Sequence, residues 1–113
     1  VIGCGVRIGK GTVVRDSIIM NESEIGDNCE LTKAIVAEKV KVGNNVVMGI
    51  GDEVPNDTAP QIYTDGLVTI GEKSEIPDGV RIGKNSVVYG VTAPIDYPDN
   101  CLPSGRSLIT AED

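Results

Sequence analysis

An aliphatic residue recurs at six-residue steps along most of this sequence, and this periodicity constrains the fold more than any other feature. The hexads open at Ile2, Ile8, Val14, Ile19, Ile25, Leu31, Val36, Val42 and Met48, and again at Ile70, Ile76, Ile82 and Val88. Two steps, from Val14 to Ile19 and from Leu31 to Val36, are five residues long. An amphipathic helix, whose period is about 3.6, cannot place such steps on one face.

A second small or β-branched residue follows each opener by four positions, and we expect both to point inward. These residues are Val6, Thr12, Ile18, Ser23, Cys29, Ile35, Val40, Val46, Ser74, Val80, Ser86 and Thr92. The position three after the opener often holds a residue that tolerates φ > 0, as at Gly5, Gly11, Asn28, Asn45, Gly79 and Asn85. Short strands alternating with left-handed corners predict an all-β fold, a left-handed parallel β-helix. This hexapeptide-repeat solenoid would form a single domain over residues 1–113.

The repeat is interrupted twice. Between Gly49 and Gly66 the sequence GIGDEVPNDTAPQIYTDG has no hexad register, which predicts a loop extruded from a coil corner over residues 49–66. After Thr92 three prolines and many polar residues follow, so we expect an irregular tail over residues 93–113. The chain starts at Val1 within a repeat and without an initiator Met, and we therefore expect it to be part of a longer protein.

The composition fits a repetitive aliphatic stack and excludes several partners. Phe and Trp are absent, and the chain has 14 Gly. With 17 acidic and 10 basic side chains the net charge is −7, which opposes contact with a nucleic-acid backbone. No apolar run approaches the roughly 20 residues of a membrane span. We therefore expect a cytoplasmic protein without membrane contact. We also expect free thiols at Cys4, Cys29 and Cys101, because these cysteines are odd in number and widely spaced.

The chain lacks the residues that several kinds of catalysis require. The chain has no His, whereas hexapeptide-repeat acyltransferases use a His base and β-helical carbonic anhydrases hold zinc with His. The segment Gly3–Gly9 superficially suggests a phosphate-binding loop, but the Lys-Ser/Thr of a P-loop is missing. The acidic residues Asp52, Glu53, Asp57 and Asp65 lack the spacing of a calcium loop. We expect no catalytic residue, metal site or cofactor in this chain.

Two long runs resemble the C-terminal β-helix domain of bacterial glucose-1-phosphate adenylyltransferase, also called ADP-glucose pyrophosphorylase. They are VVRDSIIMNESEIGDNCELTKAIVAEKVKVGNNVVMG and IYTDGLVTIGEKSEIPDGVRIGKNSVVYG. The similarity covers roughly residues 1 to 92. Its specific features are the 17-residue coil, seen when residues 8–12 are laid over 25–29 and 42–46, and the interrupting loop that leads into TIGEKSEIPDGVRIG.

The resemblance implies a non-catalytic domain with regulatory and oligomerisation roles. The parent enzyme would make ADP-glucose and pyrophosphate from ATP and glucose 1-phosphate in glycogen biosynthesis. Its N-terminal nucleotidyltransferase domain, absent here, would hold ATP and Mg²⁺ and would be the partner of the β-helix. The parent would be a homo-oligomer, expected to be a tetramer, regulated by a phosphorylated metabolite. The resemblance points to Lys39 for the effector, although Glu38 occupies the position of the family's basic residue, and to Lys33 and Arg106 as further candidates.

Other readings of the residues stay open. The same architecture occurs in other sugar-phosphate nucleotidyltransferases, such as mannose-1-phosphate guanylyltransferase, and would suit a non-catalytic regulatory paralogue. A stand-alone β-helical scaffold or an acyltransferase is a further alternative, and the missing His counts against the second. The basic residues of the first coils are either solvated surface charges or part of an anion site; they are Arg7, Lys10, Arg15, Lys33 and Lys39.

Overall fold

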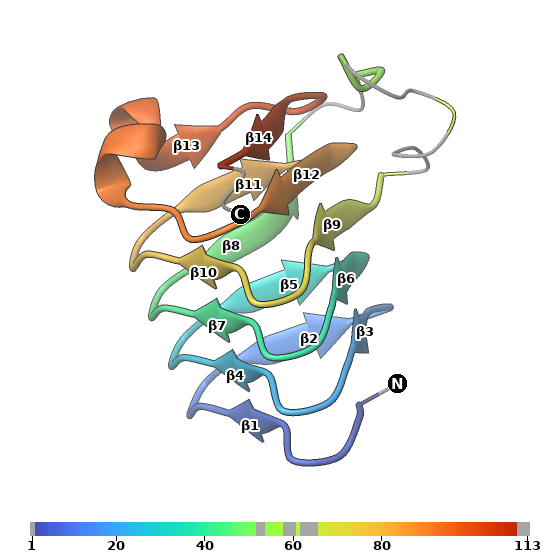
Figure 1. Ribbon diagram of the computed structural model, residues 1–113, viewed down its shortest axis with the longest axis vertical. Helices are drawn as coiled ribbons and strands as arrows, with labels where there is room; N and C mark the ends of the chain where they lie inside the picture. Colours follow the sequence, from blue (N-terminus) through green and yellow to red (C-terminus); the bar gives the residue numbers. More distant parts are fainter. Residues whose placement is uncertain (1, 52–53, 58–60, 62–65, 111–113) are drawn as a thin grey trace.

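The computed structural model describes residues 2–51, 54–57, 61 and 66–110, and shows a stack of triangular coils (Figure 1). Three parallel sheets form the sides of the prism. Sheet A consists of β3 (Ile18–Ile19), β6 (Ala34–Val36), β9 (Val68–Ile70), β12 (Ser86–Tyr89) and β14 (Ser107–Ile109). Sheet B consists of β1 (Arg7–Ile8), β4 (Glu24–Ile25), β7 (Lys41–Val42) and β10 (Glu75–Ile76). Sheet C consists of β2 (Val13–Arg15), β5 (Glu30–Thr32), β8 (Val47–Ile50), β11 (Arg81–Gly83) and β13 (Cys101–Leu102).

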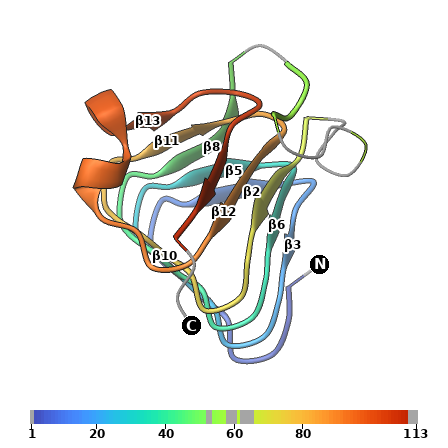
Figure 2. The same cartoon turned by 45° about the horizontal axis from the view of Figure 1, so that its top comes forward.

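The predicted left-handed parallel β-helix is confirmed, and the hexad openers stack in register along its interior. Ile8 pairs with Ile25 and Ile25 with Val42, so one coil takes 17 residues there. Figure 2 shows the coils superimposed, with one sheet on each side of a common core. The fully enclosed aliphatic side chains include Ile19, Leu31, Val36, Val40, Val46, Met48, Val68, Ile70, Val80, Ile82 and Val88. Each coil presents the same inward positions as the coil below it. Side chains of similar size therefore fill the narrow interior of the prism.

The six predicted corner residues all have positive φ, as the hexad pattern required. They are Gly5, Gly11, Asn28, Asn45, Gly79 and Asn85. The structure adds corners whose residues are neither Gly nor Asn, namely Asp16, Glu22, Lys33, Lys39 and Lys73. Side chains with a Cβ reach this region only at some energetic cost, so the stacking of the coils imposes the conformation there.

Two predicted inward residues, Ile18 and Ile35, face outward instead. Ile18 is 41% exposed, whereas Ser17 and Ala34 are buried in their place. Strand residues alternate between the faces, so the inward partner of an opener lies two residues before it. A five-residue step removes one corner residue and moves the inward position to Ser17 and Ala34. The prediction was wrong because it placed the inward residue four positions after the preceding opener instead of two positions before the next one.

The two ends of the prism differ. At the first coil Ile2 and Ile8 are 49% and 41% exposed although they occupy inward positions, because this is the first coil that the structure describes. At the other end Tyr97 is buried, and its hydroxyl shares a 2.8 Å hydrogen bond with that of Thr92. Burial raises the pKa of Tyr97 to about 12, so the phenol stays neutral near pH 7. The aromatic side chain therefore closes the core at this end.

The tail is more regular than expected. The 3-10 turns η1 (Pro94–Asp96) and η2 (Pro98–Asn100) lead into β13 and β14, which pair with β11 and β12. The predicted irregular tail over 93–113 is wrong for residues 101–102 and 107–109, and residues 111–113 lie outside the described residues. Prolines fit here because they fall in the turns or just after β13, where no ladder N–H is needed. No helix in the described part of the chain is long and apolar enough to cross a membrane.

The buried side chain of Asn85 joins both ends of the segment between β8 and β9. Its amide nitrogen donates to the Val54 carbonyl at 2.9 Å, and its amide oxygen accepts from the Gly66 N–H at 2.8 Å. Asn56, also buried, donates to the Asn85 carbonyl. The Asp57 N–H donates to the Gly105 carbonyl. The described base of this loop is therefore attached to the last two coils.

Replacing Asn85 with alanine is expected to lower the free energy of unfolding by about 2–3 kcal/mol, because the buried Gly66 N–H and the partly buried Val54 carbonyl both lose their partner. Urea denaturation followed by circular dichroism measures the change. Asn45→Ala is the matched control, since Asn45 also has positive φ but is exposed. Equal losses in the two variants would show that Asn85 acts only through its backbone conformation.

Candidate effector site

Two lysines occupy equivalent corner positions on neighbouring coils, between sheets A and B. Lys39 follows β6, and Lys73 follows β9. Both have left-handed backbone conformations, with φ of 59° and 61°. The Lys39 N–H donates to the Asn21 carbonyl at 3.1 Å, and the Lys73 N–H donates to the Glu38 carbonyl at 2.9 Å. The two lysines are thus neighbours along the stack, on coils about 4.8 Å apart.

Like charges stack on two neighbouring coils of this corner, where Lys39 adjoins Lys73 and the preceding Glu38 adjoins Glu72. On the coil below, the Lys39 position holds the opposite charge of Glu22. The ion pair found among the described residues lies elsewhere, between Arg15 and Glu30 on sheet C. Stacked like charges destabilise neighbouring strands. An anion bound between the two ammonium groups would relieve the repulsion between the lysines. The nearby carboxylates weaken the local positive potential, so the two lysines alone form only a weak anion site.

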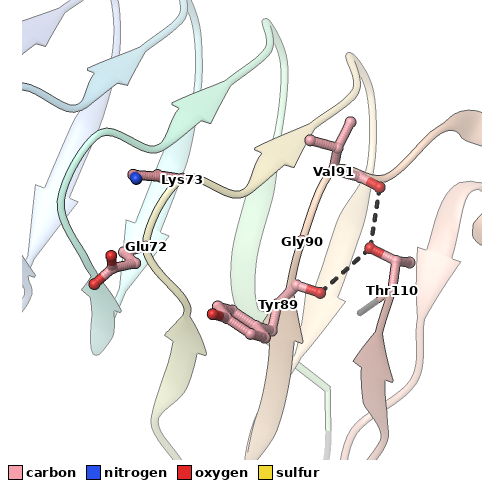
Figure 3. A pocket seen from close by; sticks show the side chains of 6 residues that line it. All are labelled: Glu72, Lys73, Tyr89, Gly90, Val91 and Thr110. Atoms are coloured by element: carbon pink, nitrogen blue, oxygen red, sulfur yellow. Dashed lines mark hydrogen bonds between the residues drawn. The ribbon is translucent and has the colours of Figure 1, made fainter. Parts of the chain in front are cut away.

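A hollow of about 330 Å³ adjoins this corner (Figure 3). Glu72, Lys73, Tyr89, Gly90, Val91 and Thr110 line it. The phenol ring of Tyr89 packs over Gly71, where a Cβ would collide with the ring, and points toward the side on which Glu72 and Lys73 lie. The Thr110 hydroxyl donates toward the carbonyls of Tyr89 and Val91, at 3.3 and 3.1 Å. An ammonium, a phenol and a hydroxyl thus border one small space.

The three predicted effector residues lie apart from one another. Lys33 and Lys39 stand at opposite ends of β6. Arg106 is exposed and directly precedes β14, at the Lys33 end of sheet A. Three strand spacings separate β6 from β14, about 14 Å in all. The three side chains therefore do not converge on one site within the chain.

Lys73 was missed by reasoning from sequence, although a signal for it exists. Lys39 stands three residues after the opener Val36, and Lys73 stands three residues after the opener Ile70. This is the corner position, but the corner rule was applied only to Gly and Asn. Lys84 was also missed; its side chain and that of Lys33 both approach Gly66.

The other candidate chemical groups have structural surroundings. In the described part of the chain no cluster of three His, Cys, Asp or Glu residues could hold a metal ion. Asp57 accepts a 2.9 Å hydrogen bond from Ser107, whereas Asp52, Glu53 and Asp65 lie outside the described residues. Cys29 is buried in the core, and burial raises the pKa of its thiol, which disfavours the reactive thiolate.

Comparison with known proteins agrees with the β-helix fold. A family model described as GlmU-like, C-terminal hexapeptide matches residues 1–70. The chain belongs to this hexapeptide family. It is 50% identical over 113 residues to the glucose-1-phosphate adenylyltransferase of Thermotoga neapolitana, a match that covers 100% of the chain and 27% of that protein. The enzyme of the same name from Acetivibrio thermocellus is 41% identical over 105 residues, covering 93% of the chain and 25% of that protein.

A third relative, the glucose-1-phosphate adenylyltransferase of Lachnospira eligens, is 53% identical over 65 residues, covering 58% of the chain and 15% of that protein. The chain spans about a quarter of the length of the first two relatives. No solved structure matches it significantly. The predicted resemblance to the glucose-1-phosphate adenylyltransferases is thereby confirmed.

Proposed function

We propose that this hexapeptide-family chain is the regulatory and oligomerisation domain of a glucose-1-phosphate adenylyltransferase. The observation that carries the proposal is the match along the whole chain, at 50% identity, to an enzyme of that name. The parent protein makes ADP-glucose and pyrophosphate from ATP and glucose 1-phosphate in glycogen biosynthesis, in the cytoplasm. ATP and Mg²⁺ bind to its nucleotidyltransferase domain, which is the partner of the β-helix, and the parent assembles as a homo-oligomer, expected to be a tetramer.

The regulatory ligand in this proposal is a phosphorylated metabolite that binds at the corner formed by Lys39 and Lys73. Two ammonium groups on adjacent coils suit the oxygens of one phosphate group. The acidic neighbours Glu22, Glu38 and Glu72 weaken this subsite, so further cationic groups from another part of the parent complete it. Lys33 and Arg106 are secondary candidates, since they face a different corner and would need a separate ligand or a neighbouring subunit.

The first test is an assay of ADP-glucose formation by the full-length parent, with and without residues 1–113 and with a panel of sugar phosphates. Truncation is expected to abolish the response to the sugar phosphates or to lower the oligomeric mass measured by light scattering. Turnover only with another nucleotide or another sugar phosphate would instead identify a related nucleotidyltransferase. A parent with no turnover would point to a regulatory paralogue.

Exchange of both Lys39 and Lys73 for alanine in the parent is expected to raise the sugar phosphate concentration needed for half-maximal activation by about tenfold or more, because two charge-assisted contacts are lost. Turnover without activator should stay within about twofold of the wild type, since neither side chain belongs to the catalytic domain. Activation curves at fixed substrate concentrations measure both quantities.

The matched control for this pair is Lys10→Ala with Lys41→Ala. Both control lysines are exposed, and they remove the same total charge from other parts of the prism. An activation curve that shifts equally in the two double variants would reflect a general loss of positive charge and remove Lys39 and Lys73 from the effector site.

A further inference from the structure

The outer face of sheet B carries a row of charges whose sign alternates from strand to strand. In stacking order, the strands of this sheet begin with Arg7, Glu24, Lys41 and Glu75. All of these residues are exposed, and Figure 1 shows their strands β1, β4, β7 and β10 directly one above another. The next outward row is small and flat, with Gly9, Gly26, Gly43 and Pro77. We call these two rows the charged face.

The charges of this face are not joined to one another within the chain. In the part of the chain that the structure describes, the ion pair lies between Arg15 and Glu30 on sheet C. Exposed opposite charges on neighbouring strands stabilise a sheet only slightly. The charged groups of sheet B are therefore available to a partner whose own charges alternate at the spacing of β-strands.

A second copy of the chain has this alternation, and the order of the signs selects its orientation. Two arrangements place the faces of two copies together with their strands aligned. A two-fold axis along the strands reverses the order of the coils, so that Arg7 of one copy faces Glu75 of the other. Glu24 then faces Lys41 in the same way. A two-fold axis along the stack keeps the order of the coils, so each charge would face its own equivalent or the small row. Only the reversed arrangement pairs every charge of the row.

The corners that border the charged face follow the same pattern. At the corner between sheets A and B, Glu22 and Lys39 occupy neighbouring coils and face each other in the reversed arrangement. At the corner between sheets B and C, Lys10 and Asp78 stand at opposite ends of one column and also face each other. The other charged residues of these corners face uncharged positions; they are Asp27, Glu38, Glu72 and Lys73. No two like charges therefore meet at equivalent positions.

The area of the charged face limits how strong this contact can be. Four strands about 4.8 Å apart, each with about six residues between corners, cover roughly 400 Å². A stable dimer normally buries about 800 Å² on each partner. Complementary charges fix the orientation of two partners more than they raise their affinity. The charged face therefore suits one contact within a larger assembly, in which other surfaces of the subunits supply further area.

We propose that the charged face of sheet B is a contact between two copies of this chain, related by a two-fold axis along the strands. Such a contact is isologous, because the same residues meet from both sides. The inference rests on the proposed function and deepens it, since it assigns the oligomerisation role to one face, one orientation and named charge pairs.

The test uses the full-length parent with Glu24→Lys and, separately, with Lys41→Glu. Either change sets like charges opposite each other twice in the reversed arrangement. We expect the dissociation constant of the assembly, measured by sedimentation equilibrium at low ionic strength, to rise by at least about tenfold. The difference from the wild type should shrink as salt is added, because salt screens exposed charges.

An equal mixture of the two variants separates contacts between chains from contacts within a chain. In a mixed pair the new lysine of one variant faces the new glutamate of the other, and the native Lys41 faces the native Glu24. Association should return to within about twofold of the wild type. Each chain in the mixture keeps its own like-charged neighbours, so this recovery can come only from contact between chains.

The matched controls are Glu30→Lys and Arg81→Glu, which make the same kinds of charge reversal at exposed positions of sheet C. They should leave the dissociation constant at the wild-type value, and all variants should keep the unfolding midpoint. Wild-type association in both sheet B variants would overturn the inference. So would weakened association that the mixture does not restore, because the charges would then act within each chain. A parent that makes no ADP-glucose would contradict the proposed enzyme but would leave this measurement of association unchanged.

Discussion

Replacing Ile25 with aspartate is expected to unfold the β-helix. Ile25 is 3% exposed, and its register partners Ile8 and Val42 lie on the coils below and above it. A carboxylate at this position would be surrounded by aliphatic side chains without a cation or hydrogen-bond donor. We expect a loss of about 4 kcal/mol or more, a large share of the 5–15 kcal/mol that stabilises a typical domain. Circular dichroism during thermal and urea denaturation measures it.

Glu24→Asp is the control for this experiment, because it places the same carboxylate one residue earlier on the same strand. Glu24 is exposed and points away from the core. Its substitution should change the free energy of unfolding by less than about 0.5 kcal/mol. If Ile25→Asp kept the wild-type unfolding midpoint, the assignment of hexad openers to the interior would be wrong.

Substitution of Gly26 by alanine is expected to cost about 2–3 kcal/mol, although it adds only one methyl group. The new Cβ would lie 2.5 Å from the Gly43 carbonyl oxygen and would also collide with the Asn44 side chain. That side chain accepts a 2.8 Å hydrogen bond from the Asp27 N–H. The neighbouring coil cannot move away without breaking the ladder, because the Gly26 N–H donates to the Val42 carbonyl. Urea denaturation provides the measurement.

The same contact recurs along this edge of the prism, which explains why glycine follows several hexad openers. Asp27 accepts from the Lys10 N–H, and Asp78 accepts from the Asn44 N–H. The control is Gly79→Asn: Gly79 has no neighbour near its Cβ position, and Asn occupies the matching corner on the coils below. It should be close to neutral. A loss in Gly26→Ala no greater than that in Gly79→Asn would mean that the coil edge tolerates a methyl group.

The interior of this protein could be predicted from the sequence because a solenoid repeats one local rule. Each opener points inward for the same reason as the one before it, so the periodicity alone located Ile25, Val42 and Ile76. The rule failed at Ile18 and Ile35, where a shortened step changes which residue of the strand faces inward. It also failed at the tail, because prolines and polar residues do not exclude strands that pair only along one edge.

The candidate site depended more strongly on the tertiary structure. Lys39 could be proposed from the sequence, but its neighbour Lys73 lies 34 positions later, beyond an insertion. Only the register of β6 with β9 shows that the two lysines are adjacent, and the same register separates Lys39 from Arg106. The hollow beside Tyr89 also needs the last strand, because Thr110, which directly follows β14, lies at its edge.

By itself, then, the sequence determined the fold class, the inward residues of the regular coils and the left-handed corners, because local steric rules repeat every six residues. The tertiary structure decided which distant side chains share a corner and how the two described ends of the prism differ. Those properties depend on how many residues each coil and insertion contains. These lengths determine which side chains become neighbours only when the coils stack.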